Sequence, residues 1–151
     1  MLRLALLSLL GMTLLPRPFC SQEEVEPNGS IGVADVARAS LPVWPPAALC
    51  GEAGGSDADF WRVPLDFHTT WLCEGEANFT LDTEGPCRLT LLSPDGMEGM
   101  PAYRVIGSWQ SAAGHIETGQ LGVMYYWRFF DHVVAVVEVN GRRAPYRLTY
   151  W

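Results

Sequence analysis

Near its carboxyl terminus the chain reads His132-Val133-Val134-Ala135-Val136-Val137-Glu138-Val139, and Asn140-Gly141 follows directly. β-Branched residues fill this run almost without interruption, which predicts a strand buried on both faces at the centre of a sheet. Asn-Gly favours a hairpin turn because both positions tolerate positive φ. Over residues 146–150, Tyr and Leu alternate with Arg and Thr, as in a strand that has one apolar face. The two segments together predict a β-hairpin.

Short segments of similar character occur upstream, separated by residues that favour turns. The candidate strands are residues 67–73, 78–81, 87–92, 103–109 and 121–130. Roughly seven short strands, with no long helix alternating between them, are typical of sandwiches and small barrels. The sequence therefore predicts an all-β, mainly antiparallel fold, either a small β-sandwich or a β-barrel.

The amino terminus predicts a secretory signal peptide, to which residues 1–20 are assigned. Met1-Leu2-Arg3 supplies a positive charge, and the apolar run that follows, residues 4–15, is too short to span a bilayer. The alternative interpretation is a buried helix or an uncleaved membrane anchor. Pro16-Arg17-Pro18 ends the run, and no A-x-A-like triplet follows to mark the cleavage site.

Beyond the signal peptide the sequence predicts one domain in two parts. Residues 21–59 are interpreted as a polar tail, one short helix and a lead-in rich in proline and glycine. The helix is expected within residues 31–41, with Ser30 as its N-cap and Pro42 as its limit. Residues 60–151 are expected to form the β domain. No second apolar stretch is long enough to cross a membrane, so we expect a secreted or periplasmic protein without a membrane span.

The charge balance is acidic. The chain has 17 Asp and Glu residues against 10 basic residues, all of them Arg. Without residues 1–20, 17 acidic residues face 8 arginines, which gives a net charge of −9. Such a surface repels phosphate groups, so we expect no binding to nucleic acid.

The four cysteines are Cys20, Cys50, Cys73 and Cys87. Export favours their oxidation. Three pairings are possible if Cys20 is retained, and one thiol is left over if it is removed. We predict a disulfide between Cys73 and Cys87, which would join neighbouring strands across a short loop and stabilise the fold by about 3 kcal/mol. The spacings match no zinc site, and no C-x-x-C is present.

The sequence contains no motif for catalysis, for a cofactor or for a metal. The histidines lack H-x-H or H-E-x-x-H spacing; they are His68, His115 and His132. A group of acidic residues lies beside glycine and proline, which indicates a solvated turn rather than a glycosidase pair; the group is Glu74, Glu76, Asp82 and Glu84. No G-x-S-x-G elbow is present. We therefore expect no enzymatic activity, no cofactor and no metal.

An aromatic run in residues 124–130 holds the candidate partner-binding residues. Successive side chains of a strand point to opposite faces, so only one face of this run can enter the core. The other face contains Tyr125, Trp127 and Phe129, and it either packs beneath another sheet or forms an exposed patch. Tyr and Trp are favoured anchors in interfaces, and a large exposed apolar patch usually binds a partner.

Three segments carry a resemblance to a known family: Gly85-Pro86-Cys87-Arg88-Leu89-Thr90-Leu91-Leu92, Trp127-Arg128 and Val139-Asn140-Gly141-Arg142. Their strand rhythm resembles that of small bacterial β-barrel inhibitors of secreted metalloproteases, over the last half of the chain. The second cysteine of that family, just upstream of the tryptophan, is missing here. The resemblance implies that the amino-terminal tail is presented to a protease.

These observations predict an exported, non-enzymatic binding or inhibitory β domain with a protein partner. Two alternatives remain open. One is an exported hydrolase whose carboxylate and histidine groups are assembled across strands. The other is a structural subunit of an envelope assembly, because acidic β domains with aromatic faces also serve there.

Overall fold

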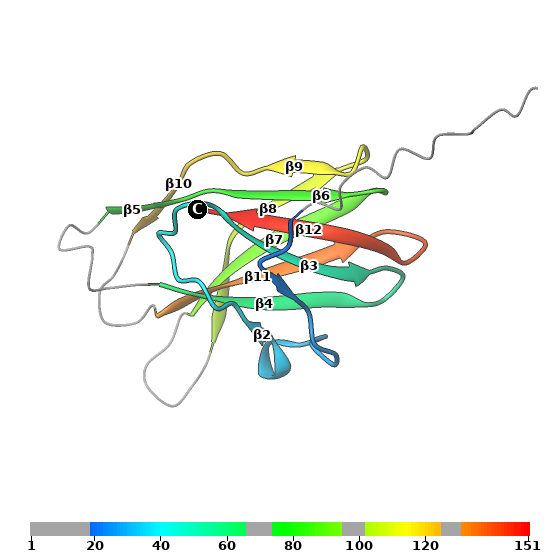
Figure 1. Ribbon diagram of the computed structural model, residues 1–151, viewed down its shortest axis with the longest axis horizontal. Coiled ribbons are helices and arrows are strands. Elements are labelled where there is room, and N and C mark those ends of the chain that lie inside the picture. The colour runs from blue at the N-terminus through cyan, green and yellow to red at the C-terminus, as the bar shows by residue number, and fades with distance from the viewer. Residues whose placement is uncertain (1–18, 66–73, 95–101, 125–130) are drawn as a thin grey trace, which may run out of the picture.

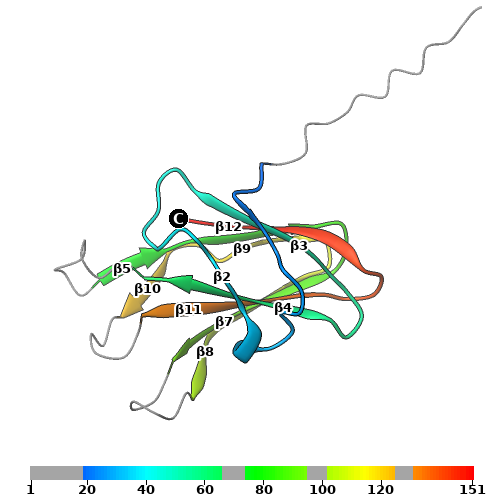
Figure 2. The ribbon, with the colours of Figure 1, turned by 60° about the horizontal axis from the view of Figure 1, so that its bottom comes forward.

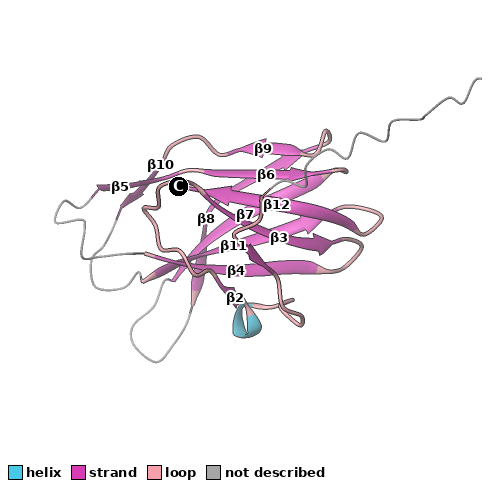
Figure 3. Ribbon diagram, viewed as in Figure 1, coloured by secondary structure: helices cyan, strands magenta, loops and turns pink. Residues whose placement is uncertain are grey.

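Figure 1 shows a computed structural model of the chain, which describes residues 19–65, 74–94, 102–124 and 131–151. Nearly all regular structure in these residues is strand, and the one helix among them is a single 3-10 turn, η1, at Ile31–Val33 (Figure 3). Two five-stranded sheets pack together. The predicted all-β fold is confirmed, and the architecture is a sandwich.

Each large sheet combines strands that are far apart in the sequence. The first has the order β1-β3-β12-β6-β9 and consists of Gln22–Glu23, Ala47–Ala53, Ala144–Tyr150, Phe79–Thr83 and His115–Glu117. The second has the order β2-β4-β11-β7-β8 and consists of Asp35–Val36, Ala58–Pro64, His132–Val139, Cys87–Pro94 and Tyr103–Ser111. A small antiparallel pair, β5 (Glu74–Ala77) and β10 (Leu121–Met124), completes the described strands. Only β1–β3 and β2–β4 are parallel pairs among them.

Strand β11 confirms the prediction from its valine-rich sequence. It lies between β4 and β7, and residues 133–137 are all buried. Val133, Ala135 and Val137 belong to the core between the sheets, whereas Val134 and Val136 are buried on the opposite face. A run of β-branched residues without alternation thus occupies the most enclosed strand of its sheet.

The predicted hairpin at Asn140-Gly141 is wrong. Strands β11 and β12 follow each other in the chain but belong to different sheets. The backbone N–H of Asn140 donates to the carbonyl of Pro86 (2.8 Å), and the carbonyl of Gly141 accepts from Gly55 (2.8 Å). Gly141 has a φ of 96°, as the sequence led us to expect. The turn therefore bonds to loops at its own end of the sandwich and carries the chain from one layer to the other.

Residues 21–36, the crossover segment, pair with both sheets instead of forming a tail, and the helix expected within residues 31–41 is shortened to the single turn η1. Strand β1 pairs with β3 in the first sheet and β2 pairs with β4 in the second, so this segment connects the two layers along one side (Figure 2). The side chain of Ser30 makes no capping hydrogen bond, and η1 ends after three residues. Beyond η1, the backbone of this segment forms hydrogen bonds with strand β4 where the sequence predicted more helix.

The cysteines also differ from the prediction. Cys20 forms a disulfide with Cys50 on β3, with the two Cα atoms 5.8 Å apart. Cys87, on the inner face of β7, is buried and is a free thiol. It therefore does not form the disulfide that the sequence predicted with Cys73. Cys73 lies outside the described residues. Burial raises the pKa of the Cys87 thiol, as expected for a core side chain.

In the described part of the chain, no helix has the length and apolar character needed to cross a bilayer. The disulfide is compatible with an extracellular or periplasmic protein. Residues 1–18, which hold most of the predicted signal peptide, lie outside the described residues.

Candidate functional site

The aromatic residues predicted to bind a partner, Tyr125, Trp127 and Phe129, lie outside the described residues. So does His68. The aromatic patch therefore stays a prediction from the sequence, and the candidate site has to be sought among the residues that the structure describes.

The two described histidines do not converge on one site. On β9, His115 Nδ1 lies 2.6 Å from Asp82 Oδ1, and its Nε2 lies 3.2 Å from Glu117 Oε1. These hydrogen bonds to carboxylates raise the pKa of His115 and engage both ring nitrogens. His132, on β11 in the other sheet, bonds to Asp131 and to the hydroxyl of Tyr103. Neither arrangement offers a free ring nitrogen to activate a nucleophile.

Part of the predicted acidic group contributes to a groove. Asp82 projects outward from β6 and Glu84 follows it, whereas the side chains of Glu74 and Glu76 are outside the description. The groove has a volume of about 920 Å³. It is lined by the Cys20–Cys50 disulfide, Gly51, Thr83, Pro145, Tyr146, Arg147 and the acidic residues Glu23, Glu24, Glu52, Asp82 and Glu84.

Strand register explains how this groove forms on the outer face of the first sheet. Apolar residues at alternating positions of β3, β12 and β6 enter the core, and the residues between them point outward. Arg147 stands directly opposite Cys50 on one side and Asp82 on the other. Five acidic residues and one arginine line the groove, so its walls carry an excess of negative charge.

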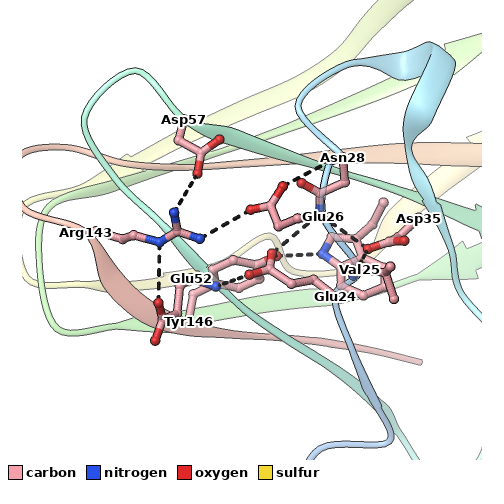
Figure 4. A network of polar contacts seen from close by, with 10 residues as sticks. Glu24, Val25, Glu26, Asn28, Asp35, Glu52, Asp57, Arg143 and Tyr146 are labelled. Atoms are coloured by element: carbon pink, nitrogen blue, oxygen red, sulfur yellow. Dashed lines mark hydrogen bonds and ion pairs between the residues drawn. The ribbon is translucent and has the colours of Figure 1, made fainter.

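A polar network adjoins this groove where the crossover segment passes between the sheets (Figure 4). Arg143, which directly precedes β12, supplies the cationic side chain of the network in this view. The guanidinium of Arg143 lies 3.3 Å from Glu26, 3.4 Å from Glu52 and 3.5 Å from Asp57. Through Arg143, these three ion pairs connect the crossover segment with strand β3 and with the turn between β3 and β4.

Glu24 reaches inward through a space that a glycine provides. A Cβ atom on Gly51 would lie 2.3 Å from Glu24 Oε2 and 2.6 Å from the hydroxyl of Tyr146. Glu24 Oε1 accepts a 2.7 Å hydrogen bond from the backbone N–H of Glu52. The hydroxyl of Tyr146 donates to Glu24 Oε2 (3.4 Å) and accepts from Trp61 Nε1 (2.7 Å). A chain of hydrogen bonds thus runs from the core to the Glu24 carboxylate.

Asp59 and Asn28 form the buried part of the network, and both are 0% exposed. Asp59 lies at the inner face of β4, next to Trp61 in the alternation of that strand. Burial, reinforced by the neighbouring Glu24, raises the pKa of Asp59 to about 8. Asp59 Oδ2 has no hydrogen-bond partner. The backbone carbonyl of Asn28 accepts a hydrogen bond from the backbone N–H of Phe60 (3.2 Å), which fixes the crossover segment against β4.

The sequence interpretation missed this cluster, because residues 21–27 read as a mobile acidic tail. A signal was nevertheless present: Glu24, Glu26 and Asn28 occupy alternate positions, and Gly29 follows. Oxygen-bearing side chains at the first, third and fifth positions, with glycine at the sixth, are also the start of the EF-hand calcium loop. The pattern could not indicate the contribution of Asp59, which lies on β4, far along the chain.

Comparison of the chain with models of protein families and with curated proteins finds no match.

Proposed function

We propose that this protein is an exported, non-enzymatic binding domain whose acidic groove receives a positively charged segment of a partner protein. The observation that carries the proposal is the groove itself. It has a volume of about 920 Å³ on the outer face of the first sheet and is lined by five acidic residues and one arginine. This volume lies within the range of ordinary ligand-binding pockets.

The chemistry of the walls favours Lys or Arg side chains as ligands. Carboxylates form charge-assisted hydrogen bonds with ammonium and guanidinium groups, and guanidinium can bond to a carboxylate through two nitrogens. A cleft lined by charge of one sign also raises the local concentration of an oppositely charged partner and accelerates association. The acidic balance of the whole chain acts in the same direction.

Export is supported by the disulfide, because such bonds persist in oxidising compartments. Since Cys20 is one of its two cysteines, a signal cleavage that spares the bond falls before Cys20. We expect amino-terminal sequencing of the exported protein to find Cys20 retained. A mature protein that begins after Cys20 would refute this boundary.

The groove can be tested with a synthetic Arg-rich nonapeptide as the probe. The groove variant is Asp82→Asn with Glu84→Gln, and the control is Glu117→Gln with Glu138→Gln. Both double variants remove two negative charges, and both remove one carboxylate partner of His115. Only the first pair lines the groove.

Fluorescence anisotropy at two salt concentrations then separates local binding from general attraction. We expect the groove variant to weaken binding of the peptide about five- to tenfold, and the control variant to change it less than about twofold. Equal weakening by both variants would assign the binding to net charge. No binding of the peptide to the unmodified protein would likewise overturn the proposal.

A further inference from the structure

We propose that Glu24, Glu26, Asn28 and Asp59 form a calcium site that joins the crossover segment to the sandwich. This inference is independent of the groove function, although Glu24 borders both features.

The spacing of the oxygen atoms suits a single ion. One carboxylate oxygen from each of Glu24, Glu26 and Asp59 lies within 4.8 Å of the others. Calcium binds oxygen ligands at about 2.3–2.6 Å, so two ligands of the same ion can be up to roughly 5 Å apart. The three carboxylates therefore lie within the reach of one calcium ion, and the Asn28 amide lies among them.

The burial of Asp59 supplies an observation that the acidic cluster alone does not. This carboxyl group is 0% exposed, and its Oδ2 lacks a hydrogen-bond partner. Ionising a buried carboxyl group without a counter-charge is costly, and this cost is the main reason for the raised pKa of Asp59. The nearby guanidinium of Arg143 forms its ion pairs with Glu26, Glu52 and Asp57. A cation held between Asp59 and its neighbours would supply the missing partner.

The Asn28 amide gives a second indication. One of its terminal atoms lies 3.0 Å from Asp59 Oδ1 and 3.2 Å from Glu26 Oε2. The other terminal atom lies 3.4 Å from Glu24 Oε2 and 3.3 Å from Asp35 Oδ2. An amide has one NH₂ group and one oxygen, so in either orientation its oxygen faces two carboxylate oxygens. A bound cation turns this repulsive contact into shared coordination.

The donor set favours calcium over other common ions. All the proposed ligands are oxygen atoms, whereas zinc sites in proteins generally include Cys or His. Magnesium requires a near-ideal octahedron and retains several waters. Calcium accepts irregular geometry with six to eight oxygens, and exposed Glu26 leaves room for water on one side. Asp35, the twelfth residue counted from Glu24, stands where an EF-hand loop has its last ligand, but strands flank this segment instead of helices.

The position of the ion gives it a structural consequence. Glu24 follows β1 in the first sheet, and Asp59 belongs to β4 in the second. An ion bound to both would hold the two layers and the crossover segment together. Calcium would therefore control how firmly this segment stays attached.

The first test uses the purified protein with its Cys20–Cys50 disulfide intact, after removal of metal with EDTA. Isothermal titration with CaCl₂ should find one ion per chain, with a Kd on the order of 10⁻⁴ M, as in extracellular modules. At about one hundred times this Kd, calcium should raise the Tm by about 10 °C. Equal concentrations of MgCl₂ should give a smaller shift.

The second test compares two carboxylates of the cluster with a neighbouring carboxylate outside it. We expect Asp59→Asn and Glu26→Gln each to weaken calcium binding about tenfold or more. The control is Asp57→Asn, which changes a partner of Arg143 outside the cluster. It should change the Kd for calcium less than about threefold. Glu26 is exposed, so Glu26→Gln keeps the test valid if Asp59→Asn fails to fold. The Asp82→Asn and Glu84→Gln groove variant should bind calcium normally.

Other results would overturn the proposal. If calcium leaves the Tm unchanged and Asp59→Asn raises it in EDTA, the cluster is a hydrogen-bonded network that needs no ion. If calcium shifts the Tm equally in Asp59→Asn, Glu26→Gln and the unmodified protein, the ion binds elsewhere. In either case the peptide measurements on the groove stand by themselves.

Discussion

Strand β11 and the crossover segment are both essential parts of the sandwich, yet different forces hold them. In β11 five consecutive residues, Val133 to Val137, are buried. In the crossover segment, residues 21–36, Asn28 is the one buried residue, and every other side chain is partly or fully exposed. This segment is instead held by a disulfide, by strand pairing with β3 and β4, and by the acidic network.

The difference matters because apolar burial and polar contacts place unlike demands on a sequence. Hydrophobic burial is non-directional and roughly proportional to the area removed from water. A suitable pattern of apolar residues is therefore sufficient to place a strand in the core. Polar groups stabilise only with the right partner at the right distance. The crossover segment should consequently respond to changes at a few partners, whereas β11 should respond to a polar residue at any of its buried positions.

The largest effect should come from a charge in β11. We expect Val137→Asp to reduce the free energy of unfolding by more than about 4 kcal/mol, because it buries an unpaired carboxylate in the core. The matched change Val36→Asp lies on β2 in the crossover segment, where the side chain is 53% exposed. It should cost less than about 0.5 kcal/mol. Urea unfolding measures both, and similar losses would show that the two regions are not held differently.

The same contrast explains how much of the fold could be predicted. The valine run in β11, the strand expected at residues 87–92 (β7) and the alternation in β12 depend on burial alone, and the structure confirms them. Strand β3 was missed because Ala47–Ala53 contains small residues and no β-branched ones. The Asn-Gly turn was recognised, but the choice between a hairpin and a change of layer depends on distant strands. Local chemistry does not encode that choice.

The candidate site was less predictable still. Glu24, Glu26 and Asn28 stand close together in the sequence, but Asp59 and Gly51 reach them only through tertiary structure. Acidic residues before a proline also read naturally as a solvated tail. The cysteine pairing failed for a related reason, since Cys50 meets Cys20 through the parallel pairing of β1 with β3, a contact between distant segments.

The second prediction removes the covalent anchor of the crossover segment. Cys20→Ser with Cys50→Ser opens a link with a sequence separation of 30 residues, and we expect a loss of about 3.5 kcal/mol from loop entropy. Hydrogen exchange should become faster in β1 while β11 stays protected until global unfolding. Cys87→Ala serves as the control, because it changes a free thiol and leaves the disulfide in place. Equal free energies of exchange in β1 and β11 of the variant would contradict a local anchor.

The third prediction concerns the glycine that admits Glu24. Gly51→Ala should displace the Glu24 carboxylate and the Tyr146 hydroxyl, since its Cβ would lie 2.3 and 2.6 Å from them. We expect a cost of about 1–3 kcal/mol, as for other overpacked sites, together with weaker calcium binding. Gly85→Ala is the control, because Gly85 lies outside the cluster and its new Cβ would have an ordinary nearest contact of 3.9 Å to a methyl group of Val139. Calorimetric unfolding with and without CaCl₂ measures both variants. An unchanged calcium response in Gly51→Ala would show that the position of Glu24 is not important.

The smallest effect should come from His115, whose carboxylate partners are exposed, unlike the buried carboxyl group of Asp59. Its pKa is raised in the folded protein by hydrogen bonds with Asp82 and Glu117, so the folded state holds this proton more tightly than the unfolded state. The stabilisation is therefore fully present below the unfolded pKa of about 6.5 and is lost as the pH rises through the higher folded value. Proton NMR titration should find a raised pKa for His115 and a lower one in Asp82→Asn. Urea midpoints of these two proteins should converge as the pH rises above that range. A difference that persists at high pH would show that Asp82 stabilises the sheet by some contact other than its bond to the imidazolium.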